Sequence, residues 1–368
     1  MLLVHESSIF DTFVQTFFEH MSFVPRQFLS ALGARISGSL QELSHDPHSA
    51  VLQQVLLQAK ALNPWFTEEQ VLRALQHWAA CLEPIQINEF VPDGSVTFRN
   101  GTVAVINAGN IPFAGLHDLL CVLVQGYHYQ GKNASEDRIL LPFIVSLIEE
   151  VAPELITRIS FVEKVSQFDM VIANGSNNTS RYFESYFSKV PHIIRKHRNA
   201  VAVISGKESA ESLKSLGGDL FDYFGLGCRN VSKLYVPQGY NFNLFFESIY
   251  DHHATLMNHH KYMNNFDYNN AVLMMKKIDF LQNGFLIVLE NVAIASPISI
   301  LHFEYYHDLE KIQQTINDCA SQIQCVATDL SLKLEIPICK LGQAQQPTLN
   351  VFADNQNTNL FLLNSGVS

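Results

Sequence analysis

Cys228 stands in the segment FGLGCRNVSKLYVP, between two nearby glycines and a run of residues typical of a strand. Gly225 and Gly227 allow a tight turn or the close approach of a substrate to the backbone. Arg229 and Lys233 follow in the sequence, and nearby cations favour the thiolate, which is the nucleophilic form of cysteine. The segment therefore predicts either a catalytic thiol at Cys228 or a structural cysteine at a turn before a strand.

Three further loops carry polar groups suited to binding. Asn110, in AGNIP, follows a buried strand-like run, where its amide could hold a developing oxyanion or simply cap a helix. Gly175 and Ser176, in ANGSNNTS, end a strand and open a helix, a common setting for a phosphate on backbone N–H groups. Lys132, in YQGKNASED, could reach a ribose or phosphate, or be a solvated surface lysine.

Two segments rich in basic residues leave alternatives open. HIIRKHRN brings Arg195 and Arg198 close in sequence, either to meet the phosphates of a nucleotide-like substrate or as a solvated basic turn. The segment DHHATLMNHHKY spaces histidines a helical repeat apart, with Asp251 as the only adjacent carboxylate. Because a metal site needs more ligands than this, we expect no metal there and histidines that pack or hydrogen-bond. These histidines are His252, His253, His259 and His260.

The elements that must position these loops follow from periodicity. Residues 1 to about 95 read as helical, and Thr67 with Gln70 forms a capping box. From Gly101 strands and helices alternate, which predicts a mostly parallel, doubly wound sheet with ligands at the strand carboxyl ends. The helical periodicity near the start rests on Phe10, Phe13, Val14 and Phe17, and the expected strands are 102–107, 127–130, 170–173 and 200–205.

Helix boundaries and a second lobe complete this prediction. Pro112 is expected to open a helix that Gly126 closes, and Ser135 to cap the next helix. A second α/β block spans roughly 206–330, with helices at 210–223 and within 242–278.

Composition bounds the class of protein. At 368 residues the chain is long enough for two lobes. The net charge of −11 argues against nucleic-acid binding, and no run of 18 apolar residues predicts a membrane span. The start, MLLVHESSIFD, does not read as a signal peptide, and the six cysteines form no CxxC pair. We therefore expect a cytoplasmic protein with reduced thiols.

Taken in order, these segments resemble the aldehyde dehydrogenase superfamily. Asn110 matches the asparagine of its PWNFP segment, Lys132 the lysine of its KPSE turn, Gly175–Ser176 its FTGS turn, and Cys228 its nucleophile. The likeness is greatest to acyl-CoA reductases of the LuxC type, especially a short version of that group, and runs from about residue 60 to the C-terminus. It rests on FGLGCRNVSKLYVP, GSNNTSRYFESYF, PHIIRKHRNAVAV, HHKYMNNFDYNN and NPWFT.

The resemblance implies a fold and a domain order. The fold is α/β and aldehyde-dehydrogenase-like, with a Rossmann-type doubly wound cofactor domain and a smaller α/β catalytic domain that carries the cysteine. We expect a helical N-terminal layer and nucleotide-binding domain over 1–205 and a catalytic domain over 206–335. Residues 336–368 would form a C-terminal segment that returns to the domain interface.

The resemblance also implies a reaction. Cys228 would attack the thioester of a fatty acyl-CoA, and NADPH, or NADH, would reduce the acyl-cysteine to the aldehyde. Asn110 and the backbone N–H of Cys228 would hold the oxyanion. Lys132, Ser135, Gly175 and Ser176 would bind the cofactor. His192, Arg195 and Arg198 are candidates for phosphate or substrate contacts.

Departures from the superfamily pattern refine the expected reaction. Ile193, beside His192, stands where dehydrogenases keep the general-base glutamate that activates water, which suits an acyl thioester meant for hydride. The ribose-holding glutamate falls on Ala293, with Glu290 as a guess at its substitute. Two alternatives stay open: cysteine-dependent acyl transfer without reduction, and a non-catalytic binding or scaffold protein. An acyl-activating synthetase is a plausible partner by resemblance, and a homo-oligomer is a further expectation.

Overall fold

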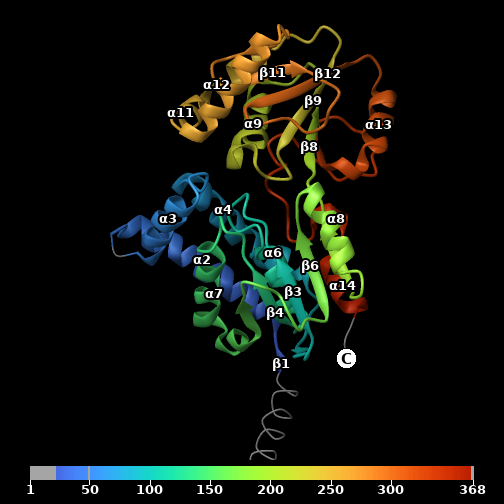
Figure 1. Ribbon diagram of the computed structural model, residues 1–368. Coiled ribbons are helices and arrows are strands. Elements are labelled where there is room, and N and C mark those ends of the chain that lie inside the picture. Colours follow the sequence, from blue (N-terminus) through green and yellow to red (C-terminus); the bar gives the residue numbers. More distant parts are fainter. Residues whose placement is uncertain (1–21, 49, 366–368) are drawn as a thin grey trace, which may run out of the picture. The chain divides into compact units, whose positions relative to one another are not determined.

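The computed structural model describes residues 22–48 and 50–365 and divides the chain into two compact units (Figure 1). The first unit combines the chain up to Lys196 with the segment from Thr348 onward, and the second spans His197–Pro347. The predicted periodicity of Phe10, Phe13, Val14 and Phe17 lies outside the described residues.

Helices form the N-terminal part of the first unit, as the sequence predicts. Thr67 caps one of them, its Oγ1 accepting a hydrogen bond from the Gln70 N–H at 3.4 Å. The chain enters this layer through a short antiparallel pair, β1 (Ser22–Phe23) with β2 (Val96–Thr97). The helices are α2 (Pro25–His45), α3 (Val51–Leu62), α4 (Glu68–Cys81) and α5 (Pro84–Phe90).

A five-stranded sheet of order β5-β4-β3-β6-β7 forms the centre of the first unit, and all its neighbouring strands are parallel. The chain enters at β3 and moves out to one edge before crossing to β6, so the switch point lies between β3 and β6. Helices α7 and α8 lie on opposite sides of this sheet (Figure 1). The elements are β3 (Thr102–Ile106), α6 (Leu116–Val124), β4 (His128–Lys132), α7 (Leu140–Val151), β5 (Ile159–Phe161), β6 (Met170–Asn174), α8 (Asn177–Tyr186), β7 (His192–Arg195) and α14 (Thr358–Asn364).

Some predicted boundaries in this unit are wrong. Residues 192–195, for which the sequence left open a phosphate site or a solvated basic turn, form β7, which pairs in register with β6. The helix expected from Pro112 begins at Leu116, after a turn. Asp137, and not Ser135, supports the start of α7, its Oδ1 accepting from the Leu140 N–H at 3.1 Å.

A seven-stranded sheet of order β10-β11-β12-β9-β8-β13-β14 forms the second unit, and only the β10–β11 pair is antiparallel. Helices α12 and α13 lie on opposite sides of it (Figure 1). The strands are β8 (Asn199–Val203), β9 (Val231–Pro237), β10 (Leu281–Gln282), β11 (Ile287–Glu290), β12 (Ile300–Tyr306), β13 (Ile323–Ala327) and β14 (Ile338–Cys339); the helices are α9 (Ala210–Phe221), α10 (Asn243–Ser248), α11 (His253–Met257), α12 (His260–Met275) and α13 (Leu309–Asp318).

Strand β8 belongs to the second unit, although the sequence analysis placed residues 200–205 in the first domain. It pairs with β9 and with β13, for example Ala202 with Leu234 and with Ala327. Every residue of β8 is buried, so its sequence fits the centre of either parallel sheet and local pattern does not choose between them. The structure therefore divides the chain after Lys196 and not after Ser205.

Candidate functional site

The carboxyl ends of β3, β4 and β6 gather most of the polar groups expected to bind a cofactor. Lys132 ends β4 directly beside Ile106, the last residue of β3, and is exposed. Gly175 follows β6, the strand on the other side of β3. Ser176 caps α8, its Oγ accepting from the Thr179 N–H at 3.2 Å. These residues share the edge where doubly wound sheets bind ligands.

Asn107 is a buried member of this edge that sequence reasoning did not single out. Its Nδ2 donates to the Tyr129 hydroxyl at 2.8 Å and to Asn133 Oδ1 at 2.9 Å, within the KNASE turn. Its Oδ1 is buried without a hydrogen bond and lies over Gly115, where any added Cβ would collide with it. Asn107 therefore fixes the turn after β4 to the end of β3. An asparagine directly after an apolar strand was the available signal.

Two predicted residues lie in exposed loops of the same unit. Asn110 is exposed in the turn between β3 and α6. Ser135 is exposed and donates its hydroxyl hydrogen bond to Glu136 Oε2 at 2.7 Å. Neither position conflicts with a contact to substrate or cofactor.

Arg195 is committed to a buried ion pair and does not offer its guanidinium to a phosphate. Its two terminal nitrogens donate to Asp118 at 2.6 and 2.9 Å, and they also donate to Thr358 Oγ1 at 2.9 Å and Asn174 Oδ1 at 3.3 Å. Burial alone would raise the pKa of Asp118, but the charge and hydrogen bonds of Arg195 hold it below its ordinary value. The prediction of a phosphate contact for Arg195 gives way to a role joining α6, β7 and α14.

The other two basic candidates lie apart from Arg195. His192 stands at the amino end of β7, the edge opposite Gly175, with its Nδ1 bonded to the Val190 carbonyl at 2.8 Å. Arg198 belongs to the second unit and donates to the Ala320 carbonyl at 3.4 Å. Ile193 is buried inside β7 beside Ile172. The cluster that HIIRKHRN suggested therefore does not form at one edge of one sheet.

Cys228 is half-buried, carries a reduced thiol and follows an unusual stretch of backbone. Tyr223, Phe224 and Gly225 have φ values of 55°, 54° and 76°, so three consecutive residues are left-handed. For the two aromatic residues this conformation costs on the order of 1–3 kcal/mol each. The ring of Phe224 is fully buried and packs on His259 at a centroid distance of 4.1 Å, which fixes it there.

The thiol lies at the amino edge of the second sheet. Cys228 comes three residues before β9, and the Ala200 N–H at the start of β8 donates to the Asn230 carbonyl at 2.8 Å. Between Cys228 and β9, the Asn230 N–H donates to the Gly227 carbonyl at 3.1 Å and closes the turn. A cavity of about 20 Å³ lies beside this loop, lined among others by Phe224 and Asn230, and is far too small for an acyl chain.

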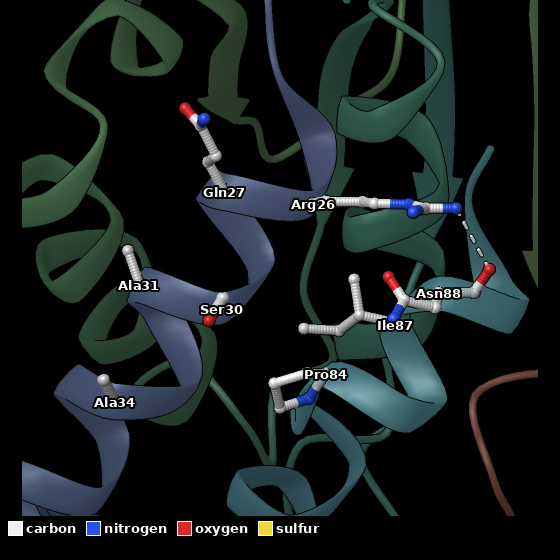
Figure 2. Close-up of a pocket in the computed structure, with 8 residues that line it drawn as sticks. All are labelled: Arg26, Gln27, Ser30, Ala31, Ala34, Pro84, Ile87 and Asn88. Atoms are coloured by element: carbon white, nitrogen blue, oxygen red, sulfur yellow. Dashed lines mark hydrogen bonds between the residues drawn. The ribbon is translucent and has the colours of Figure 1, made fainter. Parts of the chain in front are cut away.

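A larger groove of about 470 Å³ lies elsewhere in the first unit, between α2 and α5. Figure 2 shows it lined by a mixture of polar and small or apolar side chains, with Arg26 donating to the Asn88 carbonyl at 3.3 Å across one end. None of the predicted site residues lines it, so we do not assign it to the candidate site.

Two of the histidines of 252–260, His252 and His259, take packing and capping roles. His259 Nδ1 accepts from the Tyr262 N–H at 3.2 Å at the start of α12, and the His252 ring packs on Phe221 at 5.1 Å. Within residues 22–48 and 50–365, no three histidine, cysteine or carboxylate side chains gather in a way that could hold a metal ion.

Comparisons with known proteins assign the fold. No family model and no curated protein matches this sequence. Solved structures similar to the chain include aldehyde dehydrogenase 21 from Physcomitrella patens with its product succinate (13% identity, TM-score 0.61, covering 92% of this chain and 81% of that one). An acetylating aldehyde dehydrogenase from Geobacillus thermoglucosidasius gives 11% identity and a TM-score of 0.60, covering 94% and 92%. An aldehyde dehydrogenase from Mycobacterium tuberculosis, complexed with NAD+, gives 14% and 0.56, covering 82% and 73%.

These neighbours all belong to the aldehyde dehydrogenase superfamily, and the chain has an aldehyde-dehydrogenase-like α/β fold, as the sequence predicted. At such low identity the likeness shows the fold alone. Within the part of the chain that the structure describes, no helix is long and apolar enough to cross a membrane.

Proposed function

We propose that the protein reduces a fatty acyl-CoA to the aldehyde through an acyl thioester on Cys228, with NADPH as the reductant. The observation that supports this most is the half-buried thiol that follows three left-handed residues at the amino end of β9, in an aldehyde-dehydrogenase-like fold. A merely structural cysteine at a turn does not require two buried aromatic residues in a strained conformation a few residues before it.

The first unit fits a dinucleotide. Its five strands follow the order of a Rossmann sheet, and the N-terminus of α8 stands at the switch point after Gly175. A Cβ on Gly175 would approach Phe183 to 3.1 Å and Thr179 to 3.2 Å, so this position favours a residue without a side chain, while its own N–H donates to the Arg195 carbonyl at 3.2 Å. We assign Gly175, Ser176 and Lys132 to the cofactor phosphates and ribose, and Ser135 to the same loop edge. A bound NADPH supplies the hydride.

Cys228 acts as the nucleophile. Its thiolate forms a bond to the thioester carbonyl carbon, and the negative charge moves to the carbonyl oxygen. The backbone N–H of Cys228 donates to that oxyanion, and Asn110 keeps the role of amide donor that the resemblance implies. The C–S bond to CoA then breaks, which leaves the acyl group on Cys228 and a free CoA thiolate. After hydride addition, collapse of the thiohemiacetal returns the thiolate and releases the aldehyde.

Ile193 supports reduction over hydrolysis. Hydrolysis of an acyl-cysteine needs a base that activates water, and the position aligned with the superfamily's glutamate is a buried isoleucine within β7. His192, the neighbouring candidate base, is bonded through Nδ1 to the Val190 carbonyl at the amino end of that strand. An acyl thioester that is protected from water survives to meet hydride.

The test is to incubate the protein with a long-chain acyl-CoA, with and without NADPH, while intact mass and NADPH absorbance are recorded. We expect an acyl mass on Cys228 without cofactor, and its discharge as NADPH is consumed and aldehyde appears. Cys228→Ala should show neither signal. Cys319→Ala, which removes another half-buried cysteine of the same unit, is the matched control and should behave as the parent.

Other outcomes select the alternatives. Acylation that NADPH and NADH both fail to discharge points to acyl transfer to another nucleophile. Absence of acylation across short and long chains contradicts the mechanism and leaves a binding or scaffold role on the same fold.

A further inference from the structure

Two thiols other than Cys228 meet on one face of the second sheet. Cys325 lies in β13 and Cys339 in the neighbouring strand β14. Cys339 pairs in register with Ala327, and Cys325 precedes Ala327 by two residues, so both thiols point to the same face. The two thiols are close enough for each to shift the pKa of the other. Cys339 also approaches the Val326 carbonyl, with its Sγ at 3.7 Å.

The surroundings differentiate the two sulfurs. The neighbouring Cys339 thiol lowers the pKa of Cys325 although burial opposes this, and the charge of Arg229 also lowers it. The same thiol–thiol contact, together with burial, raises the pKa of Cys339. By contrast, burial raises the pKa of Cys81 to about 12. One sulfur of the pair is therefore suited to be the thiolate and the other to stay the thiol.

We propose that Cys325 and Cys339 are an oxidisable thiol pair that hydroperoxides convert to a disulfide. The Cys325 thiolate attacks one peroxide oxygen, the O–O bond breaks, and hydroxide or an alkoxide leaves, so that Cys325 becomes a sulfenic acid. Cys339 then forms the S–S bond, and its proton leaves with the sulfenic oxygen as water. The two sulfurs lose two electrons in total, and the peroxide gains them.

The strand that carries Cys339 is suited to the small movement that closing a disulfide requires. β14 has two residues and forms an edge of the sheet, so only one neighbour holds it. The loop after it is held to α9, because Asp219 accepts from the N–H groups of Gly342 and Ala344 at 2.7 and 2.8 Å, so the movement is confined to the two residues of β14. Opening of a two-residue edge strand exposes Cys325 to a small oxidant without disturbing the central strands.

Oxidation of the pair acts next to the candidate nucleophile. Arg229 directly follows Cys228 in the chain, and its charge helps to lower the pKa of Cys325. Formation of the disulfide removes the sulfur charge that Arg229 faces, so the turn between Cys228 and β9 loses one anchoring contact. All these contacts lie within the second unit, and the inference does not depend on the proposed reaction.

The test uses the full chain with Cys228→Ser, which prevents oxidation at that position, and hydrogen peroxide as the probe. Peptide mapping should find Cys325 linked to Cys339, and intact mass should fall by two hydrogen atoms. With Cys339→Ser added, Cys325 should instead accumulate a sulfenic acid that dimedone traps. With Cys319→Ser added, the linkage should form as in the parent, since this half-buried cysteine lies outside the pair.

The unsubstituted protein provides a measurement that no folding defect can confound. Its Cys325–Cys339 peptide should appear at peroxide concentrations about tenfold below those that oxidise Cys319. A pair that stays reduced while Cys319 oxidises would overturn the inference. A linkage that joins either sulfur to a different cysteine would overturn it as well.

Discussion

The two sheets place their candidate residues at opposite ends of their strands. In the first unit, Lys132 and Gly175 stand at the carboxyl ends of parallel strands, where a doubly wound sheet binds ligands. In the second unit, Cys228 comes before β9, at the amino edge. The first edge offers backbone groups and the N-terminus of α8, and the second offers the Cys228 side chain after a turn with left-handed residues. Binding needs only the general geometry of the fold, but a nucleophile needs a specifically shaped loop.

Two buried aspartates, Asp118 in the first unit and Asp219 in the second, have pKa values shifted in opposite directions. Asp118 in the first unit is paired with Arg195, which holds its pKa below the ordinary value although burial opposes it. The described hydrogen bonds of Asp219, in the second unit, all come from backbone N–H groups of the loop after β14. Burial raises the pKa of Asp219 to about 7. A partner charge therefore favours the ionised form of Asp118, whereas Asp219 is partly protonated near neutral pH.

Removal of the thiol should give the largest effect and test the role of the amino edge. Cys228→Ala should lower acylation by a long-chain acyl-CoA by on the order of 10³-fold or more, because the bond-forming atom is lost. The free energy of unfolding in urea should change by less than about 1 kcal/mol, since the side chain is half-buried. Acylation that persists in this variant at the parental rate would remove Cys228 from the mechanism.

Breaking the buried ion pair between Asp118 and Arg195 tests how strongly the stability of the protein depends on it. Asp118→Asn should destabilise the protein by about 3–5 kcal/mol, because it leaves the Arg195 guanidinium buried without its counter-charge. Glu69→Gln breaks the exposed Arg73–Glu69 pair, at 3.1 Å, and is the matched control, with an expected change within about 0.5 kcal/mol. Urea unfolding measures both. Equal effects of the two substitutions would show that burial does not distinguish these pairs.

Most of the fold could be predicted from the sequence, because strand–helix alternation is a local pattern. The strands at 102–106 and 170–174 and the capped helix after Thr67 follow from β-branched runs and capping residues. The affiliation of β8 could not be predicted, since a fully buried strand carries the same apolar residues in either sheet. Strand β7 was not predicted, because its apolar run has only two isoleucines and is followed by several basic residues.

Residues of the candidate site could be predicted only where their type is characteristic of one local backbone structure. Gly175 and Ser176 mark the end of a strand and the start of a helix, and the structure places them there. Arg195 was misinterpreted because its partner Asp118 is 77 residues away in the chain. The left-handed conformation of Tyr223 and Phe224 could not be predicted, since aromatic residues adopt it only under tertiary packing.

The raised pKa of Asp219 predicts a pH dependence opposite to that of a paired carboxylate. Between about pH 4 and pH 7 the folded protein binds a proton that the unfolded chain releases, so this group's contribution to stability falls as pH rises and levels off above about pH 7. Relative to the parent, Asp219→Asn should therefore gain on the order of 2–4 kcal/mol between pH 5 and pH 8. Urea unfolding at both pH values measures this, and parallel pH profiles would contradict a raised pKa at Asp219.

Gly225 and Gly239 lie before and after β9, so substitutions at these glycines compare the amino and carboxyl ends of a single strand. Gly225 before β9 and Gly239 after it share a φ of 76°, so alanine at either position should cost about 1–2 kcal/mol of backbone strain. Gly239 has open space around it, but a Cβ on Gly225 would meet Asn230 at 3.3 Å. We therefore expect similar losses in the free energy of unfolding, with slower iodoacetamide alkylation of Cys228 in Gly225→Ala only. If Gly239→Ala slowed the alkylation equally, the strained turn before Cys228 would not specifically control the accessibility of the thiol. The reactivity of Cys228 would then depend on β9 as a whole.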